Sequence, residues 1–154
     1  MGDADHAAQR ATLRVLAIDD NPADLKLLAT TFDAIGISVD LRTATDGRDA
    51  VELLQGELLR EHGWRPDLMI VDLSMPHIDG LETVARLRGN RALAKVPLAV
   101  LSGSIHPADR TRSLAAGANC YLIKPGNFEG LVALVKDLVA GLPPRQADAG
   151  HAGR

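Results

Sequence analysis

Three aspartates, one serine and one lysine lie just after short apolar runs of this 154-residue sequence. They are Asp19, Asp20, Asp72, Ser102 and Lys124. Aspartate supplies the hard oxygen ligands that Mg²⁺ prefers, so Asp19, Asp20 and Asp72 form a candidate magnesium site. A carboxylate beside such a metal can also act as a nucleophile and form an aspartyl-phosphate. Because phosphoryl transfer needs mainly positioning and charge neutralisation, these side chains are chemically sufficient for it.

The apolar runs alternate with amphipathic segments, and this alternation indicates which elements position the five residues. Strands are expected at residues 13–18, 37–43, 68–71, 98–101 and 120–123. Helices are expected to begin near residues 22, 47 and 107 and to cover residues 81–88 and 128–140. Residues 55–66 form a connection whose end the pattern leaves open. The alternation of strand and helix predicts an α/β fold with a parallel sheet covered by helices on both faces.

The order of the elements brings the candidate residues to one edge of this sheet. In an open parallel sheet, ligands bind outside the carboxyl ends of the strands, near the point where the strand order reverses. The five residues follow four different strands at that edge. Carboxylates held close together raise one another's pKa, so a cation is expected among them.

Composition excludes several other classes of protein. Apolar residues make up 46% and charged residues 24% of a chain with a formal net charge of −3, which is typical of a soluble globular protein and does not suggest nucleic-acid binding. The apolar runs are far shorter than the roughly 20 residues that cross a bilayer, and no signal peptide is visible, so a cytoplasmic protein without membrane contact is expected. Cys120 has no partner cysteine, and the five histidines lack zinc-ligand spacing.

The two ends of the sequence differ from the rest. Residues 1–12 and 142–154 lack an apolar period and are rich in alanine, glycine, proline and aspartate, so both are expected to be disordered tails. Residues 13–141 are expected to form one domain.

Four motifs, in this order and spacing, resemble the receiver domain of two-component response regulators over about residues 13–140. The motifs are Asp19-Asp20-Asn21-Pro22, Val71-Asp72-Leu73-Ser74-Met75-Pro76 with Asp79-Gly80, Leu101-Ser102-Gly103, and Tyr121-Leu122-Ile123-Lys124-Pro125. The resemblance implies a doubly wound, flavodoxin-like five-stranded parallel sheet with strand order 2-1-3-4-5. The four motifs together are more specific evidence of the family than any one of them, because they occur in a fixed order.

The resemblance also implies a role for each matching residue. Asp72 is expected to be the phospho-acceptor, and Lys124 is expected to pair with the phosphoryl group. Asp20 is expected to bind Mg²⁺ directly, Asp19 to bind it through water, and Ser74 to bind it through its backbone carbonyl. The bond between Lys124 and the following proline is expected to be cis.

Two further residues are expected to transmit the signal. Ser102 corresponds to the switch hydroxyl, which should move toward a phosphoryl group and let the switch aromatic, Tyr121, turn inward. The alternative for Tyr121 is an ordinary packed ring with its hydroxyl in water. For Asp19 and Asp20, the alternative is a stabilising effect near a helix N-terminus.

A narrower resemblance is to stand-alone regulators that partner phytochrome-type histidine kinases. It depends on Asp20-Asn21-Pro22-Ala23-Asp24, the lengthened second helix and loop, and Asn119-Cys120-Tyr121-Leu122-Ile123-Lys124-Pro125. The sequence departs from that group at Ser74, where asparagine is usual, and at Ser102-Gly103-Ser104, which replaces a threonine-rich motif. These side chains border the path of the water that attacks the phosphorylated aspartate, so the departures are expected to affect the rate of dephosphorylation.

The sequence therefore predicts a single-domain phosphorylation switch. The expected donor is the phosphohistidine of a sensor histidine kinase or of a phosphotransfer protein, and the expected output is an altered surface for a downstream protein or relay of the phosphoryl group. Such a protein catalyses its own phosphorylation and dephosphorylation and is not otherwise an enzyme. No output domain is expected, and an exposed apolar stripe on the last helix would favour a homodimer. The alternatives are a small Mg²⁺-dependent phosphohydrolase that uses Asp19 or Asp72, and a degenerate receiver that acts only as a binding module.

Overall fold

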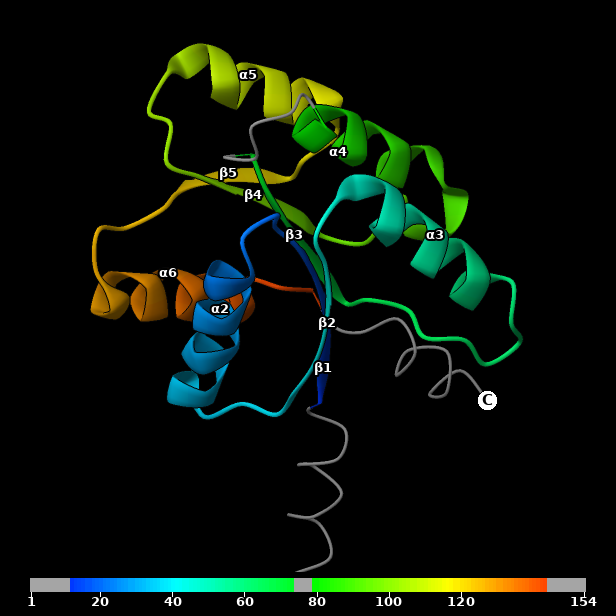
Figure 1. Ribbon diagram of the computed structural model, residues 1–154, viewed down its shortest axis with the longest axis horizontal. Coiled ribbons are helices and arrows are strands. Elements are labelled where there is room, and N and C mark those ends of the chain that lie inside the picture. The colour runs from blue at the N-terminus through cyan, green and yellow to red at the C-terminus, as the bar shows by residue number, and fades with distance from the viewer. Residues whose placement is uncertain (1–11, 74–78, 144–154) are drawn as a thin grey trace, which may run out of the picture.

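The computed structural model describes residues 12–73 and 79–143, which form a parallel sheet between two layers of helices (Figure 1). The strand order is β2-β1-β3-β4-β5, and all four strand pairs are parallel. The fold class predicted from the sequence is confirmed. The strands are β1 (Leu13–Ile18), β2 (Val39–Ala44), β3 (Leu68–Asp72), β4 (Leu98–Ser102) and β5 (Cys120–Ile123).

The helices pack on both faces of the sheet, with α2 and α6 on one face and α3, α4 and α5 on the other (Figure 1). Their bounds are α2 (Pro22–Ile35), α3 (Gly47–Leu58), α4 (Asp79–Gly89), α5 (Pro107–Ala116) and α6 (Phe128–Ala140), with a short 3-10 helix η1 (Arg91–Leu93) after α4. Alternate residues of β1 enter different cores: Val15 lies with α2 and α6, and Leu16 lies on the opposite face.

Local signals explain where α2 begins and ends. The side chain of Asn21 accepts a hydrogen bond from the Ala23 amide at 3.0 Å, and Pro22 occupies the first helical turn. Gly36 ends the helix at φ 84°, a left-handed conformation that glycine adopts without a steric penalty. Because α2 starts shortly after β1 ends, the first turn of this helix lies at the carboxyl edge of the sheet.

Some boundaries differ from the sequence expectations. Strands β3 and β4 include Asp72 and Ser102, because their backbones continue the parallel ladders opposite Leu101 and Ile123. Strand β2 is shifted to residues 39–44, and α3 continues to Leu58 into the connection whose end was open. The short helix η1 was not predicted; the side chain of Asn90 caps it by accepting from the Ala92 amide.

The connection between α3 and β3 is held against the edge strand β2 by Trp64. Its indole nitrogen donates to Asp40 Oδ2 at 2.9 Å, and its backbone amide donates to Glu57 Oε2 at 2.8 Å. The guanidinium of Arg42 lies 4.6 Å from the centre of the indole ring and bonds Glu57 at 3.1 Å. The hydrogen bond from Trp64 is the main reason that the pKa of Glu57 lies below its ordinary value of 4.5.

The ends of the described chain extend slightly beyond the expected domain. Thr12 contacts Ser38 through their hydroxyls at 3.1 Å, and Leu142 packs against the core under α2 and α6. The remainder of the two expected tails lies outside the described residues. Within those residues, we find no helix that is long and apolar enough to cross a membrane.

The apolar face of α6 is mostly covered by this core. Leu131 and Val135 are buried, and Leu134, Leu138 and Val139 pack partly against the same cluster. Phe128 at the start of the helix is 39% exposed. The helix therefore lacks the continuous exposed stripe that would favour a homodimer, and the homodimer stays a prediction.

Candidate functional site

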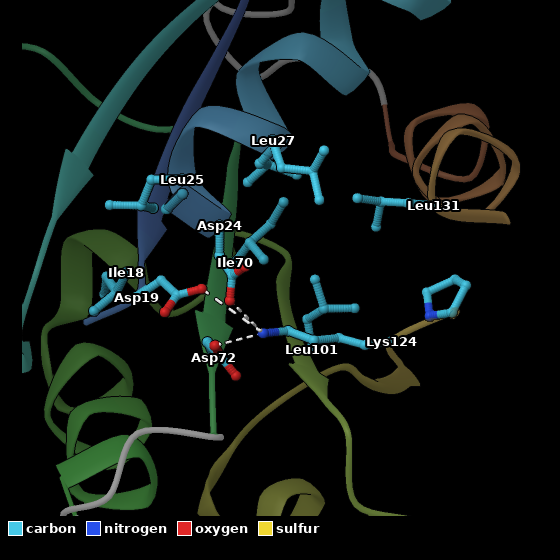
Figure 2. Close-up of a pocket in the computed structure, with 13 residues that line it drawn as sticks. Ile18, Asp19, Asp24, Leu25, Leu27, Ile70, Asp72, Leu101, Lys124 and Leu131 are labelled. Carbon is cyan, nitrogen blue, oxygen red and sulfur yellow. Dashed lines mark hydrogen bonds and ion pairs between the residues drawn. The ribbon is translucent and has the colours of Figure 1, made fainter. Parts of the chain in front are cut away.

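Lys124 joins the ends of three strands into one cluster of charges. Its ammonium nitrogen lies 2.6 Å from Asp72 Oδ2 and 3.8 Å from Asp19 Oδ2 (Figure 2). Asp72 ends β3, Asp19 follows β1, and Lys124 follows β5, where its backbone amide donates to Ser102 at 2.8 Å. Both aspartates are buried, at 4% and 6% exposure. The convergence expected at the carboxyl edge of the sheet is therefore present in the structure.

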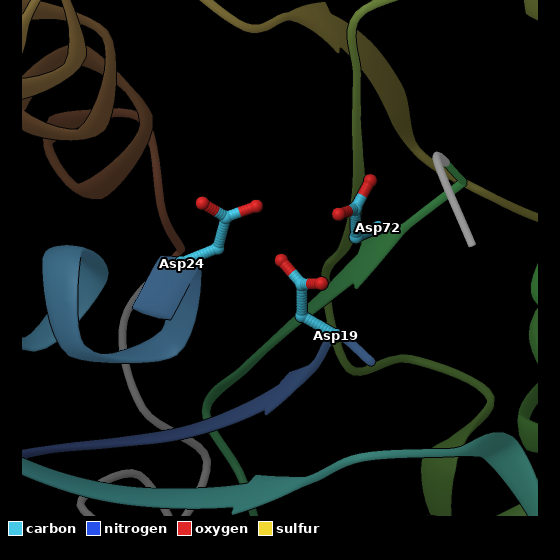
Figure 3. A group of neighbouring side chains, drawn as sticks. All are labelled: Asp19, Asp24 and Asp72. Atoms are coloured by element: carbon cyan, nitrogen blue, oxygen red, sulfur yellow. The ribbon is translucent and has the colours of Figure 1, made fainter. Parts of the chain in front are cut away.

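A third carboxylate, that of Asp24, completes the cluster and was missed in the sequence analysis. It projects from the first turn of α2, and its Oδ2 lies 3.3 Å from Lys124 Nζ. Asp19, Asp24 and Asp72 each offer an oxygen within 4.8 Å of the others (Figure 3). A signal was available, because an acid three residues after the cap residue Asn21 must lie in the first turn of a helix that starts at this edge.

Neither of the other two expected metal ligands, Asp20 and Ser74, is among the described residues of this cluster. Asp20 is exposed and is not one of the three carboxylates of this cluster, so its direct contact with Mg²⁺ stays a prediction. Ser74 lies outside the described residues. All peptide bonds of the described residues are trans, so the expected cis bond between Lys124 and Pro125 was wrong. Lys124 reaches Asp72 with this bond in the trans form.

Crowding changes the proton affinity of two groups. Burial is the main cause that raises the pKa of Asp19 from 3.8 to about 7, with further contributions from the hydrogen bond and the charge of Asp72; the Asn21 amide and Lys124 oppose the increase. Burial disfavours the ammonium of Lys124, but its hydrogen bond to Asp72 and the three aspartate charges outweigh this effect, so the pKa of Lys124 is raised.

The donor set fits a hard divalent cation. Three carboxylates and one ammonium leave two negative charges when all four groups are ionised. Oxygen ligands in a partly buried, negatively charged site are those that Mg²⁺ prefers. The cluster could therefore hold a magnesium ion, which would favour the ionised form of Asp19.

Ser102 and Tyr121 meet at Ser104, in the loop between β4 and α5. The Ser104 amide donates to Ser102 Oγ at 3.1 Å, and the Tyr121 hydroxyl donates to the Ser104 carbonyl at 2.6 Å. The Ser104 hydroxyl also bonds the carboxylate of Asp109 in the first turn of α5. These bonds connect the buried Ser102 at the site to α5 and β5. Asp109 was not identified from the sequence, and Ser104 was noted only as part of the motif Ser102-Gly103-Ser104.

The position of Tyr121 bears on two expectations. The side chain is buried, with 6% exposure, and its hydroxyl bonds a backbone carbonyl, so the alternative that placed this hydroxyl in water was wrong. The ring already lies inward, so no inward turn is needed to bring it to Ser104. Whether Tyr121 changes its packing with phosphorylation stays a prediction.

Comparison with known proteins agrees with this geometry. The model of the response regulator receiver domain matches residues 15–136. Response regulator Rcp1 of Synechocystis sp. is 32% identical over 124 residues, which are 80% of this chain and 84% of Rcp1. The Mn²⁺-bound crystal structure of Rcp1 superimposes with a TM-score of 0.71 at 30% identity and covers 85% of this chain and 99% of Rcp1.

Two other solved structures are similar over most of their length. The phosphorylated cyanobacterial phytochrome response regulator RcpA is 32% identical, with a TM-score of 0.72 over 83% of this chain and 91% of RcpA. Response regulator RPA3017, described in red light signalling of R. palustris, is 29% identical, with a TM-score of 0.74 over 86% of this chain and 99% of RPA3017.

Proposed function

Because this chain belongs to the response regulator receiver domain family, we propose that it is a phosphorylation-controlled switch whose phospho-acceptor is Asp72. The observation that carries the proposal is the contact of 2.6 Å between the buried Asp72 carboxylate and Lys124, beside two further carboxylates. A structural ion pair alone would not account for three aspartates around one ammonium.

Each residue of the cluster has a chemical role in this proposal. An oxygen of Asp72 attacks the phosphorus atom of the donor phosphohistidine, and the bond between phosphorus and the imidazole nitrogen breaks with its electron pair left on that nitrogen. The ammonium of Lys124 neutralises the negative oxygens of the transferred group. Asp72, Asp19 and Asp24 would hold Mg²⁺, with Asp20 and the Ser74 carbonyl as further proposed ligands. When bound, the ion supplies additional neutralisation of the phosphoryl charge.

The chain catalyses its own phosphorylation and slow dephosphorylation in this proposal, and its output is a changed surface or a relayed phosphoryl group. The hydrogen bonds from Ser102 through Ser104 to Tyr121 and Asp109 connect the site to α5 and β5. These two elements therefore carry the proposed change.

The donor in this proposal is the phosphohistidine of a phytochrome-type sensor kinase or of a phosphotransfer protein. The similarity to RcpA, a phytochrome response regulator, and to RPA3017 in red light signalling supports this class of partner. A downstream protein is the proposed receiver of the signal.

The experiment is phosphorylation by acetyl phosphate and magnesium, followed by peptide mapping. Wild-type protein should take up one phosphoryl group on Asp72, labile to base and to hydroxylamine, whereas Asp72→Asn should take up none. Asp33→Asn, which changes an exposed aspartate of α2, is the matched control and should be labelled like the wild type. Label on Asp19, Asp20 or a serine would overturn the assignment, and sustained release of phosphate from small phosphomonoesters would favour a phosphohydrolase.

A further inference from the structure

A cavity of about 160 Å³ lies between α2 and α6 and opens onto the carboxylate cluster (Figure 2). The polar residues of its lining are Asp19, Asp24, Asp72 and Lys124, which are the charged groups of the site. The rest of the lining is apolar and includes Leu27, Leu28, Leu101, Pro125 and Leu131. One cavity thus joins a charged end, which contains the nucleophile, to an apolar chamber.

The apolar chamber and the charged end of the cavity suit different parts of one molecule. In other proteins an apolar cavity of about 150 Å³ holds a molecule of the size of benzene, so this cavity, with its charged end included, is of a size that suits a short acyl group. The charged end contains Asp72 and the Lys124 ammonium, which suit a phosphoryl group bound with a divalent cation. A small molecule that carries a phosphoryl group on a short apolar body matches both ends.

Part of the cavity lining is exposed to solvent at Leu27, and this exposed part forms the mouth through which a small molecule would enter. Leu27 lines the cavity from α2 and is 42% exposed, whereas the neighbouring lining residue Leu28 is 6% exposed. The apolar surface therefore begins at solvent and continues inward to the sheet residue Ile70, which is 4% exposed.

We propose that this cavity binds the acyl group of an acyl phosphate, so that acyl phosphates with about four to six carbons phosphorylate Asp72 faster than acetyl phosphate does. This inference rests on the proposed function. An oxygen of Asp72 forms a bond to phosphorus, and the bond between phosphorus and the acyl oxygen breaks. The acyl group leaves as a carboxylate with the electron pair of that bond, so no further reactant is needed.

The size of the preference follows from the buried apolar surface. Butyryl phosphate carries two more methylene groups than acetyl phosphate, and burial of two methylenes corresponds to a change of about tenfold in kcat/KM. The preference should end when the acyl chain exceeds the volume of the chamber. A maximum at intermediate chain length is therefore expected.

The test measures kcat/KM for phosphorylation of the full chain by acetyl, butyryl, hexanoyl and decanoyl phosphate in the presence of magnesium. Wild-type protein should favour butyryl phosphate about tenfold, and hexanoyl phosphate at least as strongly, over acetyl phosphate and should lose this preference with decanoyl phosphate. Leu27→Trp, which narrows the mouth, should reduce the ratio of butyryl to acetyl rates toward one. Leu59→Trp is the matched control, because Leu59 directly follows α3, is 88% exposed and lies outside the cavity lining. The ratio of butyryl to acetyl rates for this variant should equal that of the wild type.

A second measurement does not depend on the variants. Butylphosphonate, which cannot transfer its phosphorus atom, should inhibit phosphorylation of the wild type by acetyl phosphate competitively and more strongly than methylphosphonate. Equal rates for all chain lengths, or equal inhibition by the two phosphonates, would overturn the acyl-binding proposal and leave the phospho-acceptor role of Asp72 intact. No labelling by any donor would instead remove the proposed function.

Discussion

Replacement of Lys124 by methionine should strongly destabilise the fold, because it leaves Asp72 and Asp19 without the ammonium that contacts both. The Asp72 side chain is 5% exposed and the Asp19 side chain is 9% exposed. Water can therefore hydrate these two carboxylates only slightly when the ammonium is removed. Removal of one partner from a buried ion pair typically costs about 3–5 kcal/mol of the free energy of unfolding. The raised pKa of Lys124 agrees with a charged form that the fold stabilises.

Urea unfolding at neutral pH, without and with millimolar magnesium, measures this cost. Lys136→Met on the exposed side of α6 is the matched control and should change the free energy of unfolding by less than about 0.5 kcal/mol. The double variant Asp72→Asn with Lys124→Met should lose less than the sum of the two single changes, because the neutral amide no longer needs a cation. Magnesium should stabilise Lys124→Met more than the wild type, since the ion replaces the missing positive charge.

Unfolding of Lys124→Met and Lys136→Met at the same urea concentration with the same slope would contradict this prediction. That result would mean that the contact of 2.6 Å contributes no net stability and that the three carboxylates are not crowded enough to need a cation. Additive effects in the double variant would lead to the same conclusion.

Three further predictions concern metal binding, pH and transmission. Millimolar magnesium should raise the melting temperature of the wild type and do so much less for Asp20→Asn; an equal increase in both would show that Asp20 is not a ligand of the ion. The stabilising effect of Glu57, whose pKa is lowered chiefly by the Trp64 amide, should be present above about pH 4.5 and disappear as the pH falls through the lowered pKa. Unfolding curves of Glu57→Gln and wild type should therefore converge in acid, whereas Glu52→Gln on the same helix should match the wild type throughout. Ser102→Ala should still accept a phosphoryl group from acetyl phosphate but show smaller changes in amide hydrogen exchange in α5, β5 and α6; changes as large as those of the wild type would show that Ser102 is not the relay.

The sequence by itself determined the class of fold and the edge at which the charged residues meet. Apolar runs that alternate with capped helices, such as the helix that starts after Asn21, are local signals, and a parallel arrangement follows from the alternation. In a parallel sheet the carboxyl ends of neighbouring strands share one edge, so the positions of Asp19 and Asp72 after their strands were sufficient to predict their proximity.

Only the tertiary structure decided which side chains touch across elements. The sequence places Asp24 in the first turn of a helix near this edge, but only the packing of α2 brings its carboxylate within 4.8 Å of those of Asp19 and Asp72. The meeting of Ser102 and Tyr121 at Ser104 and the cavity between α2 and α6 likewise depend on how separate elements pack. Periodicity indicates which face of an element is buried, but the distances between side chains of different elements are set by packing of the whole core.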